Sequence, residues 1–167
     1  MCLSMFAAAL HSACKFEVNE ASVKETKVFV MARGWNTGLS GHMGWNDGRF
    51  YLRGRYFTSY AATPSFDHRT PLELLFADGS SITLPVLEGA AGKLDYHPML
   101  ANNREAVPVF ALDPQQLQKI QHGTVTGVHL QRIDKQEVGS KRYKVSKRTA
   151  RKMSEAAQCV DESIPTN

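Results

Sequence analysis

The clearest local pattern lies near the middle of the chain, where two short apolar runs flank a tight-turn signal. Residues 72–76 and 82–86 are mostly apolar, and Asp78-Gly79 between them tolerates the positive φ of a two-residue turn. The two runs also offer cross-strand apolar pairs. Pro85 cannot donate a hydrogen bond to a neighbouring strand, so it fits a strand end or a sheet edge. The pattern predicts a β-hairpin.

Two more strands are predicted upstream, on either side of a glycine-rich stretch. Residues 26–35 are rich in β-branched and aromatic side chains, and residues 49–58 alternate between apolar and basic positions. The stretch between them, 36–48, contains four glycines and ends in Asp47-Gly48, a strong turn signal. We therefore expect a hairpin whose two strands are joined by a long loop.

A short helix is predicted in the second half of the chain. Asp113 fits a helix N-cap, Pro114 fits the first helical position, and Gln116 fits the third position of a capping box. We expect this helix to cover 114–122 and to end at Gly123 in the left-handed conformation.

A second helix is predicted at the C-terminal end, from about residue 146 to residue 160. Its apolar stripe contains Thr149, Met153, Ala156, Ala157 and Val160. Strands are predicted over 107–112 and 124–132, and irregular connections over 61–71 and 89–105.

This order of elements favours a β-rich α+β fold, either an antiparallel sheet or a β-sandwich with a short helix and a C-terminal helix. A doubly wound parallel fold would need regular alternation of strands and helices, which the pattern lacks. Neither a repeat nor a linker divides the chain. We expect residues 14–160 to form a single β-rich domain, residues 1–13 to be an export leader, and residues 161–167 to form a flexible tail.

The composition agrees with a globular domain. The chain has 167 residues, of which 43% are hydrophobic and 22% are charged, and these proportions exclude collagen-like, coiled-coil and wholly disordered classes. The longest apolar run covers residues 2–10, which is shorter than the roughly 20 residues that a membrane-spanning helix needs. No transmembrane segment is expected.

The positive charge of the chain is concentrated in one stretch. The net charge is +4, but residues 141–152 alone hold seven basic residues and no acidic one, so the rest of the chain is net negative. A nucleic acid or an acidic membrane surface is one possible partner of this stretch. The alternative is a solvated helix face. The candidate anion-binding residues are Lys144, Lys147, Arg148, Arg151 and Lys152.

The cysteines and the N-terminus bear on the cellular compartment. Residues 1–13 have the small and apolar composition of a secretory leader, although they lack its basic start. Removing them would remove Cys2 and leave Cys14 and Cys159 as an even pair, which favours a disulfide in a periplasmic or secreted protein. The alternative is a cytoplasmic protein with reduced thiols.

Aromatic and polar residues gather in and around the glycine-rich stretch. Flat rings beside amide, imidazole and carboxylate groups suit a glycan, a peptide or another protein as ligand. The alternative is that the rings pack in the core while the glycines make turns. The candidate ligand-binding residues are Trp35, Asn36, His42, Trp45, Asp47, Tyr51 and Tyr56.

The sequence offers no motif that fixes a reaction. The six histidines lack metal-binding spacing, and neither a phosphate-binding loop nor a Gly-x-Ser-x-Gly nucleophile elbow occurs. We therefore expect no catalytic residue, no metal and no cofactor. A hydrolase-like enzyme remains an alternative, and it would require His68 or His97 to meet an acid in a pocket.

Three segments carry a family resemblance. A cysteine before the first strand in Cys14-Lys15-Phe16-Glu17, a cysteine in the last helix in Ala156-Ala157-Gln158-Cys159, and the segment 111–117 before a strand are similar to a loose group of small exported bacterial β-rich proteins of unassigned activity. The resemblance implies an exported β-rich domain and transfers no catalytic residue. The sequence thus favours an exported, non-enzymatic binding or structural protein, with an anion-binding module as the alternative.

Overall fold

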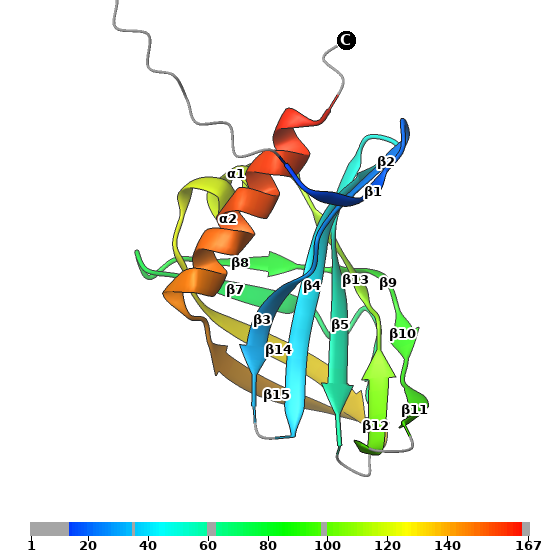
Figure 1. Ribbon diagram of the computed structural model, residues 1–167. Helices are drawn as coiled ribbons and strands as arrows, with labels where there is room; N and C mark the ends of the chain where they lie inside the picture. Colours follow the sequence, from blue (N-terminus) through cyan, green and yellow to red (C-terminus); the bar gives the residue numbers. More distant parts are fainter. Residues whose placement is uncertain (1–13, 35, 60–62, 98–99, 165–167) are drawn as a thin grey trace, which may run out of the picture.

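The computed structural model describes residues 14–34, 36–59, 63–97 and 100–164, which form two antiparallel sheets and two helices (Figure 1). The larger sheet contains β1 (Phe16–Asn19), β2 (Val23–Thr26), β3 (Phe29–Arg33), β4 (Thr37–Asn46), β5 (Arg49–Thr58), β9 (Val86–Glu88), β11 (Lys93–His97), β12 (Leu100–Ala106) and β13 (Val109–Leu112). The smaller sheet contains β6 (Ser65–Phe66), β7 (Leu72–Phe76), β8 (Ser81–Leu84), β10 (Ala90–Ala91), β14 (Val125–Asp134) and β15 (Glu137–Lys144). The helices are α1 (Pro114–His122) and α2 (Lys147–Glu162). The predicted β-rich α+β fold is confirmed.

The two sheets pack face to face and enclose the core. In Figure 1 the strands of the smaller sheet run across those of the larger one, and α2 lies beside β3 and β4. The larger sheet contributes fully buried Leu39, Met43 and Leu52, and the smaller sheet contributes fully buried Leu74 and Leu130. Each such side chain adds roughly 1.5 to 3 kcal/mol of transfer free energy, so the interface between the sheets is the main source of stability.

The stretch predicted as a long loop is instead strand β4, so that prediction is wrong. β4 pairs with β5 along its whole length, and the turn between them is only Asp47-Gly48, with φ of 44° and 85°. Gly44 lies opposite Tyr51, and a Cβ at Gly44 would overlap the Tyr51 ring. Gly44 thus leaves room for the aromatic ring on the neighbouring strand, a known way to stabilise glycine within a sheet.

The Gly44→Ala variant tests this role of glycine. The added methyl group would displace the Tyr51 ring, so we expect the free energy of unfolding to fall by about 1 to 3 kcal/mol, the usual cost of overpacking. Gly139→Ala is the matched control, because the Cβ there would lie 3.6 Å from its nearest neighbour, an Asp134 carboxylate oxygen. Equal urea midpoints for the two variants would contradict this account of β4.

The N-terminal strands differ from the prediction. Residues 26–35 do not form one strand: β2 ends at Thr26 and β3 begins at Phe29. The chain also has strands at 16–19 and 23–26, which the hydrophobic pattern did not predict. Both β2 and β3 pair with β4, at its two ends. β1 pairs with the other side of β2, whereas β3 has no second partner strand among the described residues.

The segment 89–105, predicted as a loop, contains β10, β11 and most of β12, so that prediction is wrong as well. β10 has only two residues, and β11 and β12 are rich in polar residues. All three strands depend on pairing with other segments, since β12 pairs with β5 and β11, and β10 pairs with β6. Pro85 falls between β8 and β9, as expected for a residue that interrupts a strand.

Helix α1 begins at its predicted cap, and α2 begins at Lys147, next to its predicted start near residue 146. The carboxylate of Asp113 accepts from the backbone N–H of Gln116 at 2.7 Å, and the Gln116 side chain accepts from the Asp113 N–H at 3.0 Å. Gly123 follows α1 in an extended conformation, not the predicted left-handed one. Glycine fits there because a Cβ would lie 2.6 Å from the Lys119 carbonyl oxygen and 2.7 Å from the Phe76 ring.

Helix α2 packs its apolar stripe on the core. Ala150, rather than the predicted Thr149, completes the buried row with Met153, Ala156, Ala157 and Val160. The helix continues to Glu162 and so includes two residues, Asp161 and Glu162, that were predicted as part of a flexible tail. Residues 165–167 and the predicted leader 1–13 lie outside the described residues. No helix in the described ranges is long and apolar enough to cross a membrane.

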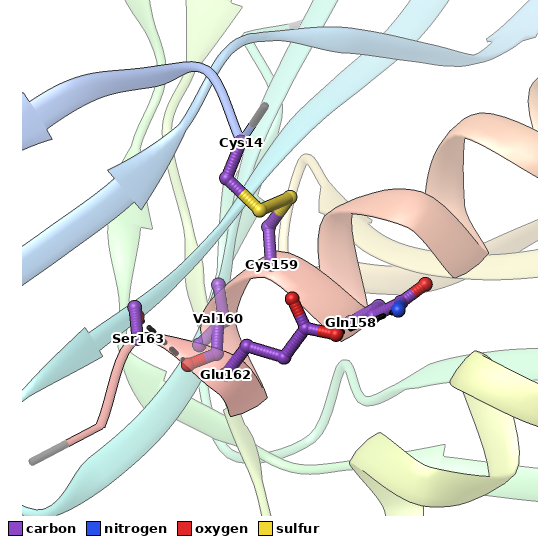
Figure 2. The surroundings of a disulfide bond; sticks show 6 residues. All are labelled: Cys14, Gln158, Cys159, Val160, Glu162 and Ser163. Carbon is purple, nitrogen blue, oxygen red and sulfur yellow. Dashed lines mark hydrogen bonds between the residues drawn. A yellow bond between two sulfur atoms is a disulfide. The ribbon is translucent and has the colours of Figure 1, made fainter. Parts of the chain in front are cut away.

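Cys14 and Cys159 form the predicted disulfide (Figure 2). Their Cα atoms lie 5.5 Å apart, although the two residues are 145 positions apart in the sequence. The bond joins the residue just before β1 to the last turns of α2. It therefore links the two ends of the described fold.

Candidate functional site

The structure does not gather the seven predicted ligand-binding residues into one pocket. Trp35 lies outside the described residues. Asn36 precedes β4, Asp47 is exposed in the β4–β5 turn, and Trp45 packs against the core. Tyr56 is fully buried and meets the Phe66 ring edge-on at 5.9 Å. Successive side chains along a strand point to opposite faces of the sheet, so the set members on β4 and β5 do not all face the same side.

His42 and Tyr51 are the two members of the set that share a polar cluster, on the outer face of the larger sheet. The Tyr51 hydroxyl donates to the buried carboxylate of Glu25 at 2.8 Å, and Arg53 Nη2 lies 3.2 Å from the same oxygen. His42 Nδ1 lies 3.8 Å from the other carboxylate oxygen. Burial, with Glu25 as the next cause, raises the pKa of Tyr51 and keeps its phenol protonated. The cluster ties β2, β4 and β5 together across the sheet.

The predicted anion-binding residues divide into two sets. Lys144, Arg148 and Lys152 line a pocket of about 530 Å³ between β3 and the first half of α2. Lys147 and Arg151 do not line it, and Arg151 pairs with Glu155 at 3.4 Å. The structure therefore separates residues that the sequence presents as one basic run.

The pocket lies against the outer edge of β3. Among the described strands, β3 pairs with β4 alone. On its open side, the Thr149 hydroxyl donates to the Val30 carbonyl at 3.1 Å. Val28 and Val30 also line the pocket, and they are 51% and 37% exposed. One wall of the pocket is thus an exposed, apolar strand edge.

Arg33 completes the cationic lining, and sequence reasoning missed it. It stands at the end of β3, more than one hundred positions before Lys144. Its only signal in the sequence is a basic residue at the end of a predicted strand. The pairing of β3 with β4 and the packing of α2 beside β3 bring it next to the basic run.

A second pocket, of about 420 Å³, continues the first along α2. The two share Val28 and Lys152, and the second adds Lys15, Lys27 and Glu155 beside the disulfide. We name the two pockets together the cationic groove. Among its described lining residues are six cations and one carboxylate, that of Glu155, which already contacts Arg151.

Four cations of the groove have no acidic partner among the residues that the structure describes. Among the described residues, no carboxylate pairs with Arg33, Lys144, Arg148 or Lys152. Among the described residues, five arginines outside the groove do pair with carboxylates, namely Arg53, Arg55, Arg69, Arg132 and Arg151. The protein thus has acids available for ion pairs, and the groove is left with uncompensated positive charge.

The start of α2 adds to this positive field. Ser146 caps the helix by accepting from the Thr149 N–H at 3.1 Å, and the first turn contains no acidic residue. Lys147 and Arg148 instead stand at the positive end of the helix dipole, where a cation is unfavourable by roughly 0.3 to 1 kcal/mol. An anion bound beside them would relieve that repulsion.

The predicted enzyme alternative gains little from the placement of its residues. His68 is exposed, and the neighbouring carboxylate of Asp67 bonds the Arg69 guanidinium. The side chain of His97 lies outside the described residues. His129 does meet an acid, Glu73, at 3.1 Å, and this contact lowers the pKa of Glu73. Among the described residues there is no cluster of three or more His, Cys, Asp or Glu side chains that would hold a metal ion.

No protein-family model, curated protein or solved structure matches this chain. The resemblance to small exported bacterial proteins, drawn from three short segments, stays a prediction. The functional interpretation therefore rests on the geometry and charge of the site itself.

Proposed function

We propose that this protein is an exported, non-enzymatic binding protein that holds an anionic ligand in the cationic groove. The observation that carries the proposal is the set of four cations around β3 and α2, Arg33, Lys144, Arg148 and Lys152, without a carboxylate partner among the described residues. Unpaired cations around a concave surface attract anions and raise their association rate. The exposed valines of the same groove add apolar contact area.

The disulfide supports the exported part of the proposal. Cytosolic thiols are kept reduced, whereas disulfides persist in the periplasm and outside the cell. Cys14 and Cys159 lie close enough to be bonded, and the bond links the two ends of the described fold. The disulfide adds to the stability of the folded protein only in an oxidising compartment, where the bond persists.

The hydroxyl groups of the groove support binding rather than catalysis. Ser146 Oγ donates to Thr149 Oγ1 at 3.0 Å, and Thr149 Oγ1 donates to the Val30 carbonyl. Neither hydroxyl contacts a histidine or a carboxylate within the described residues, so neither has the neighbouring base that a nucleophile needs. Both groups instead organise the start of α2 and the edge of β3.

A double charge reversal tests the proposal. Arg148→Glu/Lys152→Glu replaces two groove cations, and we expect it to weaken binding of a fluorescein-labelled poly-glutamate at least about tenfold, or about 1.4 kcal/mol. The measurement is fluorescence anisotropy at low salt. Raising the salt concentration should weaken binding to the unmodified protein, because ions screen exposed charges.

The matched control is Lys147→Glu/Arg151→Glu. It makes the same change of net charge on the same helix, but neither residue lines the groove. We expect its affinity to fall by only about two- to threefold, through the long-range field alone. Equal losses in both double variants would show a solvated basic face without a binding groove, and would contradict the proposal.

A further inference from the structure

We infer that the ligand of the cationic groove is an acidic, extended segment of another protein, which binds as an added strand along the open edge of β3. The inference rests on the proposed function, because it names the partner of the same groove. It goes further in assigning the main-chain groups of β3 a part in recognition. Three observations carry it: an unpaired strand edge, exposed valines on that edge, and cations beside it.

The first observation is the open edge. The Val30 carbonyl points away from β4 and accepts from the Thr149 side chain at 3.1 Å. In a continuous sheet, a backbone N–H of the next strand would take this place. The carbonyl has two lone pairs, so a peptide N–H would bond beside the hydroxyl or replace it. The edge therefore presents at least the Val30 carbonyl to the groove in the direction that strand pairing requires.

The second observation is the apolar surface of the same edge. Edge strands in natural proteins carry charges or covers that block pairing with other chains. Here Val28 and Val30 are among the few large apolar side chains of the described residues that stay exposed. Both line the groove, and an added strand would cover them. Their burial would contribute to affinity as the main-chain hydrogen bonds form.

The third observation is the charge beside the edge. Residues 28–33 span roughly 20 Å, enough for a partner strand of about six residues. Alternate side chains of such a strand would face Lys144, Arg148 and Lys152, while the others would lie beside the valines. A partner with carboxylates and apolar side chains in alternation therefore matches the groove. A nucleic acid would use the cations but leave the strand edge and the valines without partners.

Backbone methylation tests strand addition separately from charge. The probe is a capped octapeptide of alternating Glu and Val, compared with two versions N-methylated at alternate residues, one at the Glu positions and one at the Val positions. Only one of the two sets of N–H groups can face β3, because N–H groups alternate between the two edges of a strand. We expect one methylated peptide to bind at least about tenfold more weakly than the unmodified peptide, and the other to bind within about threefold.

Amide hydrogen exchange of residues 28–33 gives the second readout. We expect the unmodified peptide to slow exchange of β3 amides, because ordered pairing shields them from water. Equal affinity of both methylated peptides, or unchanged exchange in β3, would overturn strand addition. Tighter binding of a duplex DNA than of the octapeptide at the same salt would overturn it too.

Poly-glutamate distinguishes the failure of this inference from the failure of the proposed function. If poly-glutamate binds and is sensitive to Arg148→Glu/Lys152→Glu while the methylated peptides bind equally, the groove binds anions but β3 takes no strand. If neither poly-glutamate nor the octapeptide binds, both the inference and the proposed function are wrong. The oxidised protein, with its disulfide intact, is used throughout.

Discussion

Replacing both disulfide cysteines, in Cys14→Ala/Cys159→Ala, is expected to lower the free energy of unfolding by about 4 to 5 kcal/mol. The bond closes a loop of 145 residues, and in the chain-entropy model such a loop strongly restricts the unfolded chain. This loss is a large part of the 5 to 15 kcal/mol that typically holds a domain folded. Urea denaturation followed by tryptophan fluorescence measures it.

The reduced form of the unmodified protein is the control for the cysteine variant. Dithiothreitol removes the same cross-link without changing the side chains, so its urea midpoint should match that of the double variant. A double variant as stable as the oxidised protein would contradict the account of the disulfide. So would two titratable thiols at these positions in the native, isolated protein.

Leu52→Ala is expected to cost about 2 to 5 kcal/mol, the second-largest effect. Leu52 is fully buried in β5, and it lies against Gly41 of β4, where a Cβ would come within 3.1 Å of its Cδ1. Gly41 has no side chain to move into the space, but Met31 Cε lies beside the same position and can fill part of it. We therefore expect a cost near the middle of the range.

Leu87→Ala is the matched control for the core variant. It removes the same atoms from β9, but Leu87 is 43% exposed. We expect a change within about 0.5 kcal/mol, as for most surface substitutions. Similar losses in the two leucine variants would mean that the space between the sheets is not the principal core.

Elements with local signals were predicted well. The cap and capping box of α1 lie within four residues. The predicted hairpin of β7 and β8 forms around Asp78-Gly79, although only Gly79 has a positive φ and the connection is longer than the predicted two-residue turn. Strand β5 is found at its predicted bounds because its apolar and basic positions alternate. In each case the physical cause lies within a few residues of the element.

Elements set by distant contacts were not predicted. The glycines of β4 suggest a loop when read alone, and only their pairing with β5 shows that they accommodate Phe57 and Tyr51. The short polar strands β11 and β12 likewise depend on pairing with one another and with β5. The composition of a segment does not show which distant strand it will pair with.

The candidate site was likewise predicted where its signal is local, and not where it depends on distant contacts. The basic run of 141–152 was visible in the sequence, because its charge is local. Its separation into groove and outward-facing residues was not, because that depends on which side of α2 packs beside β3. Arg33, Val28 and Val30 join the groove through tertiary packing alone. The paired cysteines were predicted from parity, a property of the whole chain.

The central claim is that the groove between β3 and α2 is the binding site, and chemical-shift mapping tests it most directly. A ¹⁵N-labelled sample is titrated with poly-glutamate, and the chemical shifts of its backbone amides are followed. We expect the largest shifts in 28–33 and 144–152, with the outer faces of β9 and β13 unchanged. The largest shifts at β9 and β13, or shifts spread evenly over all surface lysines and arginines, would contradict the claim.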